Sequence, residues 1–107
     1  MLLNRTSKIV RKDIENKALI LEAIRAYETR DTRRGATTLN VMYQVYLSYN
    51  RTQYYLTELL QGRMIERDVG TKNYILTEKG THYLTAYYDL DSILDTDNGC
   101  RATHESN

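Results

Sequence analysis

Apolar residues return at helical spacing in the centre of the chain, between a serine and a glycine. The hydroxyl of Ser48 can accept a hydrogen bond from the free N–H groups of a first helical turn, and Gly62 provides a permissive stop. The residues between them that fall on one stripe of a 3.6-residue helix are Thr52, Tyr55, Leu56, Leu59 and Leu60. The pattern predicts a helix over residues 49–61 with one buried face.

An earlier helix is predicted from about Asp13, a plausible N-cap, to Glu28. Its inward stripe consists of Ile14, Ala18, Leu21 and Ile24, widened by Ile20 and Tyr27. The polar residues 29–37 that follow predict a loop leading into a short edge strand. Within this loop, Arg33 and Arg34 either meet phosphate or keep the loop soluble.

A short second helix is predicted over residues 38–46, directly before Ser48. Its predicted buried residues are Leu39, Met42 and Val45 or Tyr46. Two helices joined by such a tight turn are typical of a helix-turn-helix.

The segments 64–69 and 73–77 are rich in β-branched and large residues and are separated by Gly70, Thr71 and Lys72, which predicts a short hairpin. The hydroxyl of Thr77 can then cap a last helix that continues to about Leu94. Helix, turn, helix, hairpin and helix in this order predict a mainly α fold with a small β-hairpin (α+β), a winged helix-turn-helix with a C-terminal helix.

The polar face of the helix at 49–61 presents Asn50, Arg51, Gln53 and Tyr54. Arginine pairs with guanine in the major groove, and asparagine or glutamine pairs with adenine. The alternative is a face that is merely solvated, but its position after a capped turn favours contact with bases. The sequence therefore predicts a recognition helix.

The hairpin at 64–77 would then be a wing. Lys72 is predicted near its tip beside Thr71, with Arg67 on the incoming strand, so that cations press on phosphate or enter a minor groove. Alternatively, the tip is polar only because it is exposed.

The last helix has two apolar edges. Tyr83, Tyr87, Leu90 and Leu94 are spaced four, three and four apart, as in a coiled-coil seam, and Leu84 and Tyr88 form a second edge. Two edges predict two neighbours, which are the domain itself and another copy of the chain. A homodimer through this helix is therefore expected, although the seam is shorter than three heptads.

Residues 41–84 resemble archaeal winged-helix DNA-binding proteins, of the small dimeric regulator or chromatin-associated type. The shared motifs are Met42-Tyr43 in the second helix, Leu47-Ser48-Tyr49 before the recognition helix, and Thr77-Glu78-Lys79-Gly80 at the last helix. The chain departs from the family at Thr52, where an apolar residue is common, and at Arg63-Met64-Ile65, where Gly-Leu-Ile or similar is usual.

The resemblance implies binding to duplex DNA, either sequence-specific or architectural, and often as a homodimer joined through the C-terminal helix. By analogy, the second helix crosses the DNA backbone, where Thr38 at its N-terminus and the hydroxyl of Tyr43 meet phosphate. Core packing is the alternative role for Tyr43.

Charge is unevenly distributed although the net charge is only +1. Residues 1–35 hold nine Lys or Arg against five acids, residues 36–80 hold five against four, and residues 81–107 hold one against five. We therefore expect three parts: a basic N-terminal arm at 1–12, a winged-helix domain at 13–94 with a dimerisation helix at about 77–94, and a disordered acidic tail at 95–107. The arm either touches the DNA backbone or frays.

Composition excludes several classes of protein. One cysteine makes no internal disulfide, and no Cys/His cluster has zinc-ligand spacing. The chain has no nucleophile motif, paired-carboxylate pocket or phosphate-binding glycine loop, so neither an enzyme nor a cofactor is expected. No apolar run is long enough to span a membrane, which predicts a cytoplasmic, nucleoid-associated protein.

Three functional hypotheses follow. The first is a transcriptional regulator that binds double-stranded DNA with helix 49–61 in the major groove. The second is an architectural chromatin protein that tolerates any sequence. The third is a winged helix that docks on a transcription or replication complex, which the weak basicity and the outward Glu58 favour.

Overall fold

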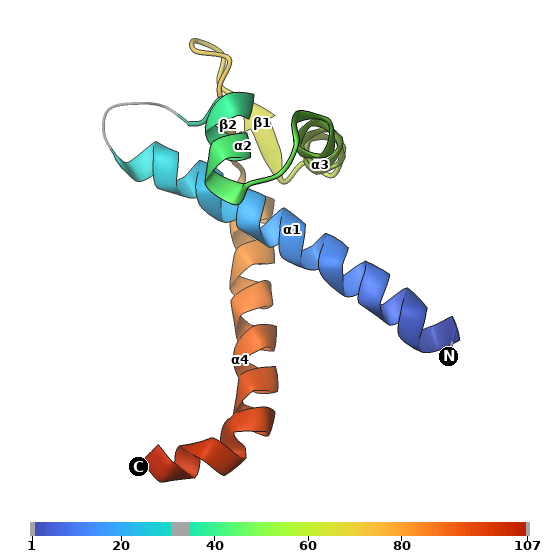
Figure 1. Ribbon diagram of the computed structural model, residues 1–107. Helices are drawn as coiled ribbons and strands as arrows, with labels where there is room; N and C mark the ends of the chain where they lie inside the picture. The colour runs from blue at the N-terminus through green and yellow to red at the C-terminus, as the bar shows by residue number, and fades with distance from the viewer. Residues whose placement is uncertain (1, 31–34, 107) are drawn as a thin grey trace.

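The computed structural model contains four helices and a two-stranded hairpin (Figure 1). It describes the backbone of residues 2–30 and 35–106 and the side chains of residues 12–28 and 35–93. The elements are α1 (Leu2–Arg30), α2 (Thr38–Val45), α3 (Tyr49–Gln61), β1 (Ile65–Arg67), β2 (Tyr74–Leu76) and α4 (Glu78–Ser106). The predicted winged helix-turn-helix with a C-terminal helix is confirmed.

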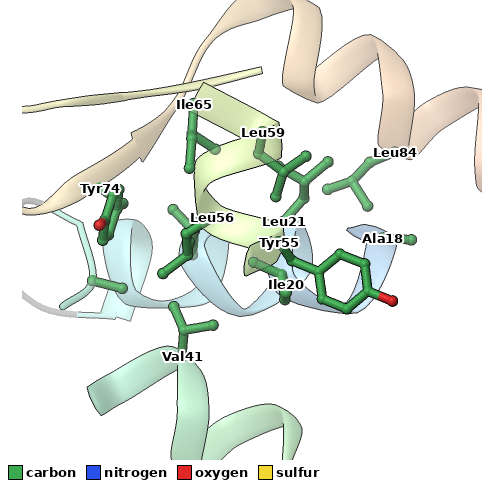
Figure 2. Packing of buried hydrophobic residues seen from close by; sticks show 12 residues of the cluster. Ala18, Ile20, Leu21, Val41, Tyr55, Leu56, Leu59, Ile65, Tyr74 and Leu84 are labelled. Atoms are coloured by element: carbon green, nitrogen blue, oxygen red, sulfur yellow. The ribbon is translucent and has the colours of Figure 1, made fainter. Parts of the chain in front are cut away.

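The hydrophobic core forms where α2, α3, the hairpin and α4 meet the second half of α1 (Figure 2). From α1 it takes Ala18, Ile20, Leu21 and Ile24, and from the other elements Val41, Tyr55, Leu56, Leu59, Ile65, Tyr74 and Leu84. The inward stripes predicted for α1 and α3 are largely confirmed. Burying each large aliphatic side chain contributes about 1.5 to 3 kcal/mol.

The buried residues predicted for α2 are confirmed only in part, because Val45 packs against the core but Leu39 does not. Val41 is the buried residue of this helix, whereas Leu39 and Tyr46 are exposed and Met42 and Val45 are half-buried. The helix has eight residues, and apolar side chains occur on nearly all of its sides, so periodicity could not determine its inward face.

The predicted N-cap of α3 is confirmed, because the Oγ of Ser48 accepts a hydrogen bond from the Arg51 N–H at 3.2 Å. The helix stops differently from the prediction. Gly62 has an ordinary φ of −83°, and the left-handed residue is Arg63, with a φ of 63°. Arginine thus stands at a position where glycine would be less strained.

Thr52, the other departure from the family pattern, is fully buried. Its hydroxyl donates to the backbone oxygen of Ser48 at 2.8 Å. A buried hydroxyl with an acceptor one turn back carries no unsatisfied donor, which explains why the core accommodates this threonine.

The hairpin is antiparallel, with Glu66 opposite Ile75 in the register. The predicted edge strand is a single bridge, in which Ala36 and Tyr74 exchange two backbone hydrogen bonds of 3.0 and 2.8 Å. Two residues further along β2, a carboxylate oxygen of Glu28 accepts the Leu76 N–H at 2.6 Å. The outer edge of β2 is therefore occupied by Ala36, which lies just before α2, and by the Glu28 side chain of α1.

The start of α4 explains the Thr-Glu-Lys-Gly motif. The Thr77 hydroxyl accepts the Gly80 N–H at 3.1 Å, which confirms the predicted cap. A Cβ on Gly80 would lie 2.2 Å from the backbone oxygen of Met64. Only glycine therefore lets α4 approach the hairpin this closely.

The outer helices are longer than predicted. α1 begins at Leu2 rather than near Asp13, and α4 continues to Ser106 although disorder was predicted after Leu94. The chain has no proline, so nothing sterically ends either helix, and extending a helix is far easier than nucleating one. The N-terminal half of α1 and the C-terminal half of α4 leave the body in different directions (Figure 1).

The contact between Glu28 and Leu76 gives a first prediction. Glu28→Ala leaves a backbone N–H without its acceptor, so the free energy of unfolding should fall by about 1.5 to 3 kcal/mol, as measured by urea denaturation. Glu15→Ala, an exposed position on the same helix, serves as the control and should change it by less than about 0.5 kcal/mol. Equal losses in both variants would contradict the prediction.

Candidate nucleic-acid interface

The outer face of α3 is open to solvent. Asn50 and Arg51 are exposed, more than half of Tyr54 is exposed, and Gln53 is half-buried on the flank next to α2. This arrangement follows from the burial of Thr52, Tyr55, Leu56 and Leu59 on the opposite side. The four residues predicted to contact bases therefore occupy the outer face and one flank.

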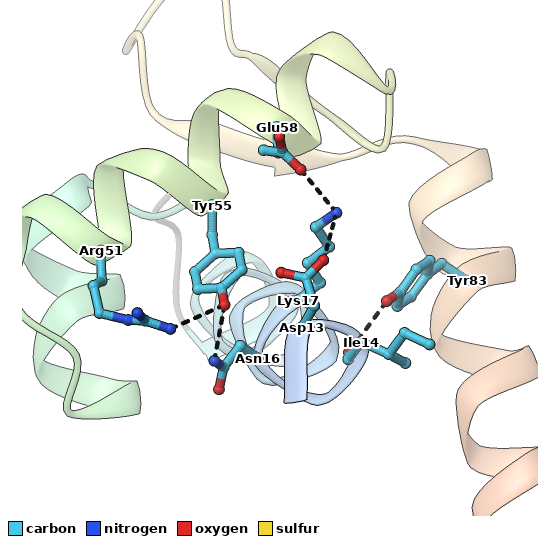
Figure 3. A network of polar contacts seen from close by, with 8 residues as sticks. All are labelled: Asp13, Ile14, Asn16, Lys17, Arg51, Tyr55, Glu58 and Tyr83. Atoms are coloured by element: carbon cyan, nitrogen blue, oxygen red, sulfur yellow. Dashed lines mark hydrogen bonds and ion pairs between the residues drawn. The ribbon is translucent and has the colours of Figure 1, made fainter. Parts of the chain in front are cut away.

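Arg51 leans back along its own helix. Its Nη2 donates to the Tyr55 hydroxyl at 3.1 Å, and its Cζ lies 5.5 Å from the centre of the Tyr55 ring (Figure 3). The Nδ2 of Asn16 on α1 donates to the same hydroxyl at 3.1 Å. Guanidinium has five N–H donors, so this contact orients the group while other donors stay available.

An ion network ties α1 to the middle of α3. The Nζ of Lys17 lies 3.1 Å from a Glu58 oxygen and 3.3 Å from an Asp13 oxygen (Figure 3). Burial lowers the pKa of Lys17, but the Glu58 and Asp13 carboxylates outweigh that effect, and the net pKa is raised. Lys17 therefore stays charged, and it pairs with the Glu58 carboxylate on the flank of α3 that faces α1.

Tyr54 presents a neutral phenol. The Glu58 carboxylate is the main cause of its raised pKa, followed by desolvation and by Asp13. Its ring meets the Tyr55 ring edge-on, at 5.2 Å between centres. At neutral pH the hydroxyl therefore keeps its proton and can donate a hydrogen bond.

A shallow pocket joins this face to α1. Its lining consists of Lys12, Asp13, Asn50, Arg51, Tyr54 and Tyr55. The sequence predicts a terminal arm for Lys12 and a capping role for Asp13. Their proximity to α3 arises from how the helices cross, and no local pattern indicates it.

Two of the predicted contact residues bind each other. The Thr38 hydroxyl, at the start of α2, donates to the Gln53 side-chain oxygen at 3.2 Å. The N-terminus of α2 is closed by a capping box between Thr37 and Asn40. The Gln53 amide keeps both N–H donors, whereas the Thr38 hydroxyl proton is already shared.

The wing turn is built around Asp68, which sequence analysis did not single out. This buried carboxylate accepts the Thr71 N–H at 2.9 Å and the Thr71 hydroxyl at 3.1 Å. The Asp68 backbone oxygen accepts the Lys72 N–H at 2.8 Å, and Lys72 has a left-handed φ of 68°. The sequence does carry a signal for this role, because aspartate often begins a turn and Gly70 follows two residues later.

Arg67 braces the wing and does not extend from it. Its guanidinium donates to the Lys72 oxygen at 3.1 Å and to the Tyr74 hydroxyl at 2.7 Å, and its Cζ lies 4.5 Å from the Tyr74 ring centre. Lys72 and Val69 are exposed near the tip. The cation at the tip is therefore Lys72.

The seam predicted on α4 is divided. The Tyr83 hydroxyl donates to the Ile14 oxygen of α1 at 3.1 Å, and burial raises the pKa of this tyrosine (Figure 3). Tyr87 is half-buried, while Leu90 is 51% exposed. An almost wholly apolar hollow is lined by Ile14, Tyr83, Ala86, Tyr87 and Leu90. The side chain of Leu94 lies outside those described.

The second predicted edge of α4 packs onto the body at Leu84, whereas Tyr88 is 38% exposed and reaches α1 through its hydroxyl. Leu84 is fully buried, and the Tyr88 hydroxyl donates to the carboxylate of Glu22 on α1.

Within the described part of the chain, no group of three or more His, Cys, Asp or Glu is placed to hold a metal ion. None of the helices that could be searched is long and apolar enough to cross a membrane.

The Lys17–Glu58 pair gives a second prediction. A double-mutant cycle with Lys17→Met and Glu58→Gln should yield a coupling energy of about 0.3 to 1 kcal/mol at pH 7, from urea denaturation. The folded pKa of Lys17 is raised, so this stabilisation is fully present below the ordinary lysine pKa of about 10.4 and is lost as pH rises through the folded value. A coupling that stays constant into strong alkali would refute the assignment.

Comparison with known proteins supplies the family. A family model described as winged helix-turn-helix matches residues 11–95, well over half of the chain and the whole of α2, α3 and the hairpin. A search of curated protein sequences finds no significant match. The matched segment contains the capped turn, the open face of α3 and the wing, which together indicate DNA binding. The chain therefore belongs to the winged helix-turn-helix family.

Proposed function

We propose that this protein is a transcriptional regulator that binds double-stranded DNA with α3 in the major groove and the wing on the backbone or in the minor groove. One observation carries the proposal: α3 buries one face completely and leaves Asn50, Arg51 and Tyr54 open to solvent on the other. A helix with an open polar face, preceded by a capped turn, fits the major groove in this family of folds.

Each side chain has a role suited to its chemistry. The planar guanidinium of Arg51 pairs with the O6 and N7 of guanine, and the amides of Asn50 and Gln53 pair with adenine. The neutral phenol of Tyr54 donates to a base edge or a phosphate. The contact between Arg51 and Tyr55 supports this role, because it holds the guanidinium close to α3 before DNA binds.

The wing supplies contacts that position the protein. Lys72 meets the phosphate backbone at the tip. The hydroxyls of Thr71 and Thr38 donate to Asp68 and Gln53, so each has to leave that acceptor before it can donate to phosphate. Because the Arg67 guanidinium is bound to Lys72 and Tyr74, its role is to hold the tip in place. Such a regulator acts in the cytoplasm, on the nucleoid.

The protein acts as a homodimer through α4. The apolar hollow at Ile14, Tyr83 and Tyr87 also includes Leu90, and Ile93 follows one helical turn later; both Leu90 and Ile93 are more than half exposed. The α4 helix of a second copy matches this surface, since each copy offers both the hollow and the projecting side chains. Two recognition helices then meet half-sites about one DNA turn apart.

Architectural binding, without sequence preference, uses the same surfaces. Selection of bound duplexes from a random pool separates the two, because a regulator enriches a consensus and an architectural protein does not. A palindromic consensus would also report the symmetry of the dimer.

Arg51 gives the third prediction. Arg51→Ala should weaken binding to the selected duplex by about 1 to 3 kcal/mol and relax the preference at one base position. Arg51→Lys keeps the charge without the planar fork, so it should lose the same preference while retaining more affinity. Both effects are measured by fluorescence anisotropy and repeated selection. An unchanged consensus in both variants would exclude Arg51 from base recognition.

The dimer gives the fourth prediction. Leu90→Glu places a charge in the proposed interface and should weaken dimerisation by about 2 kcal/mol or more, seen by sedimentation velocity. Thr85→Glu, an exposed position on the opposite side of α4, is the matched control and should leave the dimer intact. A monomeric wild-type protein at high micromolar concentration would disprove the dimer.

A further inference from the structure

The helix-turn-helix itself is electrically neutral. Residues 35–62 hold one basic residue, Arg51, and one acidic residue, Glu58, and residues 35–50 hold no charged residue at all. Glu58 is paired with Lys17, and Arg51, which leans on the Tyr55 hydroxyl, is assigned to a base and not to phosphate. DNA-binding domains usually meet phosphate with lysine and arginine, and this surface has no such group to spare.

Tyrosine takes the place of cations on this surface. Tyr43 on α2 is 67% exposed, Tyr46 in the turn is 91% exposed, and Tyr49 at the start of α3 is 53% exposed. The exposure of Tyr43 excludes the core role that was its alternative. These three phenols lead along the chain directly to Asn50 and the outer face of α3.

Tyr46 is the most informative of the three. It adopts the left-handed conformation, with φ 58° and ψ 41°, where its N–H donates to the Met42 oxygen at 2.9 Å and ends α2. Glycine or asparagine occupies such a position with less strain. Because the side chain is almost wholly exposed, its burial contributes almost nothing to folding. A strained residue without benefit to the fold indicates a function for the side chain.

We infer that the helix-turn-helix approaches the DNA backbone on the neutral hydroxyls of Tyr43, Tyr46 and Tyr49 and not on lysine or arginine. The inference rests on the proposed function, since it takes duplex DNA as the partner. When a recognition helix lies in the major groove, the preceding helix and turn cross the backbone, which is where these phenols stand. A phenol O–H donates to phosphate oxygen, and its ring covers the adjoining sugar.

This mode of binding has a measurable signature. Each phosphate neutralised by a cation makes log K fall with log salt by about 0.9, whereas a neutral donor displaces no counterion. The affinity should therefore depend only weakly on salt, through the few cations outside the helix-turn-helix, such as Lys72. Removing a phenol should lower the affinity equally at every salt concentration.

The test measures Kd by fluorescence anisotropy between about 50 and 300 mM NaCl, on the selected duplex and on a 30-base-pair duplex of random sequence. Tyr43→Phe and Tyr46→Phe should each weaken binding about three- to tenfold without changing the salt slope. Lys72→Ala should instead flatten the slope by about 0.9. Tyr88→Phe removes a phenol from α4, away from this surface, and should bind as the wild type does.

Tyr46→Gly separates the role of the side chain from that of the fold. Glycine relieves the left-handed strain, so the midpoint of thermal unfolding should rise while DNA affinity falls at least as far as in Tyr46→Phe. A gain in stability together with a loss of binding cannot come from misfolding.

Two results would overturn the inference, and they differ from each other. If the wild type binds but the Tyr43 and Tyr46 variants bind equally well, the proposed DNA-binding function stands and the phenols serve another purpose, such as docking a protein. If the wild type binds neither duplex at 50 mM NaCl, the proposed function fails as well.

Discussion

The packing of α1 against every other layer is the constraint on which the molecule depends. Its apolar stripe lies beneath α2, α3, β2 and α4, and its polar side chains extend to the same neighbours. Asn16 binds Tyr55, Lys17 binds Glu58, and Glu28 binds the backbone of β2. Because α3 is held on one side by α1, its opposite side has to face solvent. The open polar face of α3 is thus a consequence of the core.

Sequence periodicity predicted α3 well and α2 poorly, for a physical reason. α3 has thirteen residues, a serine cap and polar residues opposite its apolar stripe, so a single orientation satisfies the pattern. α2 has eight residues with apolar side chains nearly all round, and the packing against α1 chose Val41 as its buried residue. The bounds of α1 and α4 were placed too far inward because helical periodicity fades toward both ends of the chain, although no proline interrupts either helix.

The candidate site was predictable where it depends on the helix period and unpredictable where it depends on tertiary contacts. The exposure of Asn50, Arg51 and Tyr54 follows from the buried stripe of α3. The contact between Arg67 and Tyr74 could not be predicted without the register of the hairpin. The position of Lys12 near α3 could not be predicted without knowing how α1 and α3 cross. The sequence identifies the cations of the wing but not that the Arg67 guanidinium is held against Tyr74.

The carboxylate of Glu28 has a further effect on the behaviour of the molecule in a crowded cell. A strand at the border of a sheet is a template for foreign strands, and small domains must guard it. Here β2 offers its Tyr74 N–H to Ala36 and its Leu76 N–H to Glu28, so these outward donors are occupied. A helix side chain thereby closes this edge of the hairpin to pairing with a strand of another molecule.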